Sequence, residues 1–210
     1  LPIVWIGIVL SVFQQAVGIN VIFYYSTSLW QSVGFTESDA LTQTVITSVT
    51  NIVVTVVAIA LIDKIGRRRL LMTGSIGMTL SLGVMAAMFS TATMVEGADG
   101  ALTPQLGDTQ GVIALIAANG FVVFFGMSWG QAVWVLLGEM FNNRIRTAAL
   151  GLAAAAQWLA NFAVSTAFPS MAEASLTFTY GFYAVSALLS LLFVARFIPE
   201  TTGRSLEEME

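Results

Sequence analysis

Six long stretches without a charged residue near their middle constrain the fold of this chain more than any other feature. A helix of about 20 apolar residues crosses the hydrocarbon core of a bilayer. Only 10% of the residues are charged, whereas about a quarter are charged in a typical soluble domain. The sequence therefore predicts an all-α membrane protein with six transmembrane helices, at residues 1–34, 42–62, 70–95, 111–138, 147–171 and 176–197, and a tail at 198–210.

Prolines and basic residues support this division. All four prolines lie at the ends of the stretches or in loops, which favours continuous helices: Pro2, Pro104, Pro169 and Pro199. Alternate connections carry all of the Lys and Arg, and the other three carry acids alone. The positive-inside rule makes the basic side cytoplasmic, so both ends of the sequence are predicted to be cytoplasmic. The basic residues are Lys64, Arg67, Arg68, Arg69, Arg144, Arg146, Arg196 and Arg204.

The chain contains neither cysteine nor histidine. It therefore offers no disulfide, no Cys or His metal ligand, no thiol nucleophile and no imidazole base, and we expect no metal site and no cofactor. A membrane enzyme would need a Ser or Thr nucleophile without an obvious base. Nothing points to a nucleic-acid partner. The sequence begins without Met or a charged leader, so we expect a piece of a longer chain.

Neutral amides are the main polar groups inside the predicted helices. Each amide presents donors and an acceptor, which suits an uncharged ligand with several hydroxyls. The alternative is that they tie helices together across the bilayer. Their number and their clustering with Trp and Tyr favour a water-filled cavity over that alternative. The eight amides are Gln14, Gln15, Asn20, Asn51, Asn119, Gln131, Gln157 and Asn161.

The first stretch places its polar residues on two faces. At about 100° per residue, Gln14, Gln15 and Tyr25 share one face with Gly18, whereas Asn20 and Tyr24 lie on another. One straight helix cannot point all of them at one ligand. A break near residues 18–20 would allow it, because glycine tolerates non-helical backbone.

The fourth stretch carries a strip of glycines around one indole, at four-residue spacing: Gly126, Gly130, Trp134 and Gly138. Close helix packing of the GxxxG kind would explain the strip equally well. However, the first and fourth stretches begin two successive three-helix units. Polar helices interrupted by glycine at matching positions of repeated units are typical of a transporter site near the bilayer midplane. A channel would instead show a continuous polar stripe.

Five motifs in order resemble the sugar porters, a branch of the major facilitator superfamily. They are "QQAVGIN" followed by "FYYS", "DKIGRRRL" (63–70), "WVLLGEMFNNRIR" (134–146), "QWLANF" (157–162) and "PETTGRSLEE" (199–208). The resemblance implies a twelve-helix transporter, of which this chain would be the C-terminal half, built from two inverted three-helix repeats. Two positions depart from the family pattern. The fourth stretch lacks the prolines of G-P-x-P-W, so it would bend less or by its glycines alone, and Thr202 stands where Lys is common.

The resemblance also implies residue roles. The residues expected to contact a sugar are Gln14, Gln15, Asn20, Asn51, Trp134, Gln157 and Trp158. An extracellular gate would contain Tyr24 and Tyr25. Six cytoplasmic charges would bridge the two halves of the transporter, and the less favoured alternative is that they are only topology signals at solvated helix ends: Asp63, Arg67, Arg68, Glu139, Arg146 and Glu200.

The expected function is transport of a monosaccharide by alternating access, with a hexose such as D-glucose carried together with a proton. Alternatives are another neutral solute (an inositol, a pentose or a disaccharide), facilitated diffusion, or a structural or channel-like six-helix protein. The expected partners are the sugar, the N-terminal six-helix half and the lipid bilayer. Alanine-rich stretches without long loops indicate the inner membrane of a bacterium.

Overall fold

The computed structural model describes residues 2–203 of the chain. Six helical segments in this part are long and apolar enough to span a membrane. The prediction of an all-helical protein with six candidate spans is therefore confirmed. The end of the predicted tail, residues 204–210 with Arg204, lies outside the described residues. The spans are Pro2–Tyr24, Glu37–Ile65, Arg67–Ser90, Asp108–Met140, Arg146–Ala174 and Leu176–Phe197.

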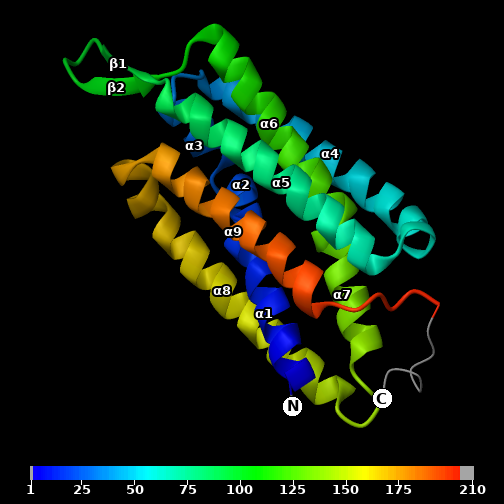
Figure 1. The fold of residues 1–210 in the computed structure, drawn as a ribbon. Coiled ribbons are helices and arrows are strands. Elements are labelled where there is room, and N and C mark those ends of the chain that lie inside the picture. The colour runs from blue at the N-terminus through cyan, green and yellow to red at the C-terminus, as the bar shows by residue number, and fades with distance from the viewer. Residues whose placement is uncertain (1, 204–210) are drawn as a thin grey trace.

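Four of the spans are single helices, whereas the first and fourth are divided (Figure 1). The single helices are α4 (Glu37–Ile65), α5 (Arg67–Ser90), α8 (Arg146–Ala174) and α9 (Leu176–Phe197). The predicted first stretch contains α1 (Pro2–Ala16), α2 (Ile19–Tyr24) and α3 (Ser26–Ser32). The fourth contains α6 (Asp108–Met127) and α7 (Trp129–Met140).

The break between α1 and α2 lies where the polar pattern predicts it. Gly18 has φ +85°, in the left-handed region that glycine adopts without a steric penalty. Its N–H donates to the Gln15 carbonyl and closes α1. A second interruption follows at Tyr25, between α2 and α3. The helix is therefore interrupted twice within the predicted first stretch.

The break between α6 and α7 falls at Ser128, not at a glycine. Its hydroxyl donates to the carbonyl of Phe124, and such a bond competes with helical backbone pairing. Gly74 of α5 leaves the space for this serine, since a Cβ there would overlap its hydroxyl. The sequence predicted either little bending in this span or bending by its glycines. In the structure the break lies at a serine that faces a glycine on a neighbouring helix.

The third span ends at Ser90, earlier than the predicted boundary at residue 95. The chain then forms an antiparallel hairpin of β1 (Thr93–Glu96) and β2 (Leu102–Gln105). Gly100 has φ +77° in the turn, where the N–H of Gly97 donates to the Ala101 carbonyl. Polar and glycine-rich residues outside the bilayer thus pair with each other rather than extend the helix.

Pro169 lies within α8, so the expectation that all prolines sit at helix ends or in loops was wrong for this residue. A proline has no N–H to donate to the carbonyl four residues earlier. Here that carbonyl belongs to Ser165, and the Tyr25 hydroxyl donates to it at 2.9 Å. A side chain from the first span thus satisfies the backbone group that the proline leaves free.

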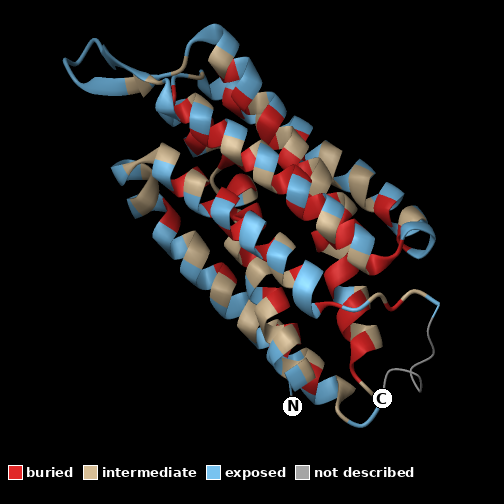
Figure 2. Ribbon diagram, in the orientation of Figure 1, coloured by how far each residue is buried: buried red, intermediate tan, exposed pale blue. Residues whose placement is uncertain are grey.

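Helix α5 is the centre of the bundle and packs most extensively against α9 and α6. Gly77 of α5 lies directly against the Phe124 ring, which brings the two helices close together. In contrast, α4 and α8 each bury only 17% of their most apolar 18 residues inside the described chain. Figure 2 shows mostly exposed and half-buried residues along α8. Two apolar helices are therefore open to lipid or to another protein part.

The two ends of the bundle differ in charge. The start of α1 and the end of α9 lie at the end opposite the β1–β2 hairpin (Figure 1). The basic α4–α5 connection, with Arg67 at the start of α5, lies toward the same end. The acids Glu96 and Asp99 belong to the hairpin end.

Candidate functional site

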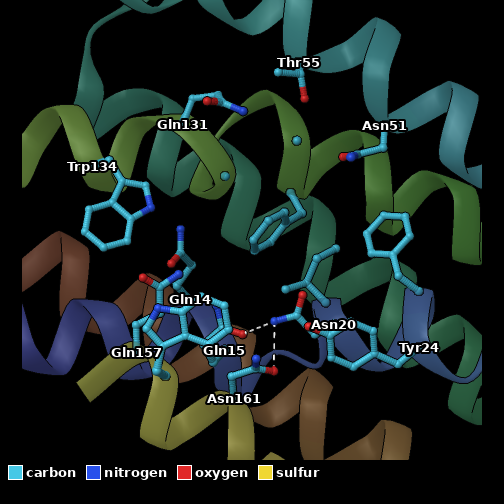
Figure 3. Close-up of a pocket in the computed structure, with 16 residues that line it drawn as sticks. Gln14, Gln15, Asn20, Tyr24, Asn51, Thr55, Gln131, Trp134, Gln157 and Asn161 are labelled. Carbon is cyan, nitrogen blue, oxygen red and sulfur yellow. Dashed lines mark hydrogen bonds between the residues drawn. The ribbon is translucent and has the colours of Figure 1, made fainter. Parts of the chain in front are cut away.

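A cavity of about 390 Å³ lies among α1, α2, α4, α6, α7 and α8 (Figure 3). All seven residues predicted to contact a sugar line it, although they come from five different helices. Tyr24 also lines it. The described lining contains no Asp, Glu, Lys or Arg, which suits an uncharged ligand. The seven are Gln14, Gln15, Asn20, Asn51, Trp134, Gln157 and Trp158.

The turn at Gly18 is what brings the first-span residues to one side. Gln14 and Gln15 lie on α1, before the turn, and Asn20 lies on α2, after it. A Cβ at position 18 would stand 2.8 Å from the Tyr183 ring of α9, so the backbone also packs closely there. The glycine is therefore required for both its conformation and its size.

Gln14 is held by the fourth span. Its Nε2 donates to the Trp129 carbonyl at 2.8 Å, beside the break between α6 and α7 at Ser128. The indole N–H of Trp129 in turn donates to the Leu71 carbonyl and to the Ser75 hydroxyl. Within the described residues the Gln14 Oε1 is buried without a hydrogen-bond partner. A ligand hydroxyl in this cavity could supply the missing donor.

The second amide group joins three helices. Asn20 Nδ2 donates to Gln15 Oε1 and, at 3.0 Å, to Asn161 Oδ1 of α8. The Ser165 hydroxyl donates to the same Asn161 oxygen at 3.1 Å. The hydrogen bonds that join Asn20 to Gln15 and Asn161 are drawn in Figure 3.

The opposite wall combines amides, aromatic rings and glycine. Asn51 and Thr55 of α4 face the cavity with Trp134 of α7. A Cβ at Gly126 would stand at an ordinary contact distance of 3.5 Å from Asn51 Oδ1 and at a tighter 3.2 Å from Val54. Gly130 lines the cavity as well. Ring faces and directional amides are the two kinds of contact that a sugar ring and its hydroxyls require.

Two of the three glycines in the strip of the fourth span line the cavity, and the third does not. Gly126 and Gly130 line the cavity together with Trp134. Gly138 lies outside it, and a Cβ there would meet nothing within 4 Å in the described chain. Asn119 of α6 is likewise outside the cavity. Thr47 of α4 donates to the Asn119 Oδ1. This amide therefore ties two helices together, which is the alternative interpretation of the interior amides.

Three polar residues of the lining were not among the predicted sugar contacts. Asn161 and Gln131 were recognised as interior amides, but the motif resemblance assigned them no role. Thr55 carried no signal of its own. It follows Asn51 by four residues, and that helical spacing places both on the same face of α4. An argument from helical faces on α4 could have found it.

The two tyrosines predicted to form a gate have different positions. Tyr24 lines the cavity and its side chain is 58% exposed. Tyr25 lies outside the main cavity and its ring packs against Phe168 with centroids 5.0 Å apart. Its hydroxyl donates to Ser165, as described above. Both tyrosines line a neighbouring pocket with Trp158, so of the pair Tyr24 alone lines both pockets.

Four of the six predicted cytoplasmic charges gather around Arg67. Its guanidinium lies 2.8 Å from Asp63 and 2.7 Å from Glu139, and its backbone N–H donates to Glu200 at 3.1 Å. The Thr201 hydroxyl donates to the second oxygen of Glu139. The connection after α9 is therefore fastened to α5 and α7.

Within the described residues, Glu200 is held by hydrogen bonds rather than by an ion pair. Partial burial alone would raise the pKa of its carboxyl. The hydroxyl and N–H of Thr202, with the N–H groups of Arg67 and Thr201, outweigh this and hold the pKa below its ordinary value. Thr202, the departure from the family pattern, is thus the residue that donates to Glu200 twice.

Arg68 and Arg146 lie apart from this cluster. Arg68 donates to the Ala195 carbonyl at 2.9 Å and Arg146 donates to the Phe141 carbonyl at 3.1 Å. Among the described residues, the Arg146 Nη2 is buried without a hydrogen-bond partner.

Comparison with known proteins agrees with this arrangement. Residues 1–210 match the family described as "Sugar (and other) transporter". A glucose transport protein of Synechocystis sp. is 56% identical over 210 residues, which are 100% of this chain and 44% of that protein. The D-xylose-proton symporter of Escherichia coli K12 is 40% identical over 215 positions, 99% of this chain and 40% of that protein.

A solved structure supports the same relationship at the level of the fold. A crystal structure of a double tryptophan mutant of XylE matches with a TM-score of 0.84 at 38% identity. The match covers 99% of this chain and 42% of that chain. This chain therefore spans about two fifths of the length of the relatives it matches.

Proposed function

Because this chain belongs to the sugar transporter family, we propose that it is the C-terminal six-helix half of a transporter that moves a monosaccharide by alternating access. It is a multi-pass membrane protein and not an enzyme. The N-terminal half would complete the cavity from the other side. The polar and aromatic lining of the cavity is the observation that carries this proposal.

The chemistry of the lining supports a neutral polyol as substrate. Amides from α1, α2, α4, α7 and α8 face one space of about 390 Å³, and no charged residue lies among the described lining. That volume falls within the range of about 300–1,000 Å³ typical of small-molecule sites. A charged substrate would gain no opposite charge there.

We propose D-glucose as the substrate because the 56% identical relative is named a glucose transport protein. A pentose is the second candidate, since another relative is named a D-xylose-proton symporter. Inositols and disaccharides remain alternatives within the same chemistry. Competition between unlabelled sugars and labelled glucose separates these candidates.

We propose proton symport as the mode of coupling, with facilitated diffusion as the alternative. A carboxylate that exchanges protons at mid-membrane would have to belong to the other half, because the cavity lining described here has none. The response of uptake to a proton gradient distinguishes the two modes.

We propose that the charge cluster around Arg67 biases the transporter between its two conformations. Arg67 is buried and pairs with Asp63 and Glu139 of this chain, so the cluster forms one fixed surface of this half. Contacts from that surface to the N-terminal half, made in one conformation only, would shift a two-state equilibrium. The N-terminal half would supply a partner for Arg146. In this arrangement the transporter lies in the inner membrane of a bacterial cell, and both ends of this chain face the cytoplasm.

The test is uptake of labelled D-glucose by the full-length transporter in liposomes, with and without an inward proton gradient. Gln14→Ala removes both the bond to the Trp129 carbonyl and the free acceptor in the cavity. We expect the efficiency of glucose uptake (kcat/KM) to fall about tenfold or more, because a lost hydrogen bond of this kind costs about 1–3 kcal/mol. Asn119→Ala is the matched control, because it removes a membrane amide outside the cavity.

Saturable uptake that Gln14→Ala reduces and Asn119→Ala leaves unchanged would support the proposal. Uptake that rises linearly with sugar concentration would indicate a channel. If no sugar is taken up under either condition, the proposed function is wrong.

A further inference from the structure

We propose that Ser165 and Asn161 of α8 are positioning residues that fix the orientation of the Asn20 and Gln15 carboxamides toward the sugar. This inference rests on the proposed function. It follows from how the donors and acceptors of the amide group are used, and it assigns a role to a serine that does not line the described cavity.

Asn20 has its donors occupied. Its NH₂ carries two hydrogens, and Nδ2 donates one to Gln15 Oε1 and the other to Asn161 Oδ1. The carbonyl oxygen Oδ1 is the part of this amide that remains for a ligand. Asn20 therefore presents an acceptor to the cavity (Figure 3).

Gln15 and Asn161 have their oxygens occupied instead of their NH₂ groups. The Gln15 oxygen accepts from Asn20, and the Asn161 oxygen accepts from both Asn20 and Ser165. Their NH₂ groups are left to face the cavity as donors. The group therefore offers one acceptor and two donors, and a hydroxyl of a polyol can donate to the acceptor while it accepts from a donor.

Asn20 and Ser165 together hold the Asn161 amide in place. Turning this amide over would set its NH₂ against the Asn20 NH₂ and lose the bond from Asn20, with or without Ser165, because a serine hydroxyl can accept as well as donate. The Ser165 hydroxyl adds a second bond to the Asn161 oxygen, and it thereby restricts the Asn161 side chain to the rotamer that reaches Asn20.

The backbone of Ser165 also holds the first span in place. Its carbonyl is free for Tyr25 because Pro169 lacks the N–H that would use it within α8. Ser165 therefore binds the Asn161 amide through its side chain and the α2–α3 junction through its backbone. Replacing only its side chain leaves the Tyr25 bond intact, which separates the two effects.

The test compares Ser165→Ala, Ser165→Thr and Thr166→Ala in the full-length transporter. Thr keeps the hydroxyl, and Thr166 makes no hydrogen bond to these amides in the described part of the chain. We expect Ser165→Ala to raise the KM for D-glucose uptake about two- to tenfold at unchanged maximal rate, the equivalent of one neutral hydrogen bond. Ser165→Thr and Thr166→Ala should keep the wild-type KM.

Hydrogen–deuterium exchange of residues 19–25 without sugar is the second readout. Ser165→Ala should exchange faster there than Thr166→Ala, since α2 loses part of its support on α8. If wild type transports glucose, an unchanged KM in Ser165→Ala overturns this inference and leaves the proposed function standing. If wild type transports no sugar, the proposed function fails and the exchange rates decide: equal rates in both variants overturn the inference, and faster exchange in Ser165→Ala retains it.

Discussion

Gly18→Ala is the perturbation that tests most sharply why the first span breaks. Alanine in the left-handed conformation at φ +85° costs about 1–2 kcal/mol. Its Cβ would also lie 2.8 Å from the Tyr183 ring, closer than real Cβ contacts allow. Overpacking of this kind costs about 1–3 kcal/mol. The free energy of unfolding should therefore fall by about 2–5 kcal/mol.

The assay is thermal unfolding of the purified full-length protein in detergent, followed by tryptophan fluorescence. Gly83→Ala on α5 is the matched control, because a Cβ there meets nothing within 4 Å and alanine favours the helix. We expect Gly18→Ala to melt well below wild type and Gly83→Ala to melt at or above it. Equal melting of the two glycine variants would refute the reasoning.

Three further predictions concern other parts of the structure. Trp129→Phe removes the indole N–H that bonds to Leu71 and Ser75, so it should lower the free energy of unfolding by about 1–3 kcal/mol in the same melting assay. Asn51→Ala should raise the KM for sugar uptake about two- to tenfold, whereas an unchanged KM would remove it from the site. The lowered pKa of Glu200 contributes stability above the ordinary value of 4.5, and this is lost as the pH falls below it. Glu200→Gln should therefore show a smaller drop in melting temperature below pH 4.5 than wild type does, and equal drops would contradict the assignment.

The number of membrane spans could be predicted because it depends on length and hydropathy alone. The break at Gly18 could also be predicted, because the polar residues around it lie on two faces of an ideal helix. The seven residues taken from motif resemblance line one cavity in the structure. Their binding of sugar remains a prediction.

The remaining features depend on contacts between distant segments. The Ser128 side chain, at the break, occupies space that Gly74 on another helix leaves open, and nothing near Ser128 in the sequence indicates this contact. Pro169 is accepted inside α8 because Tyr25, far away in the chain, replaces the missing donor. Asn161 bonds to Asn20 of α2, which lies 141 positions away in the chain. Local propensity contains none of this information.

The most direct test of the central claim is a structure of the full-length transporter with D-glucose bound. The sugar is predicted to lie among the amides of the cavity, within hydrogen-bond distance of Gln14, Asn20 and Asn51. Sugar density at another place, with this cavity empty of it, would contradict the account.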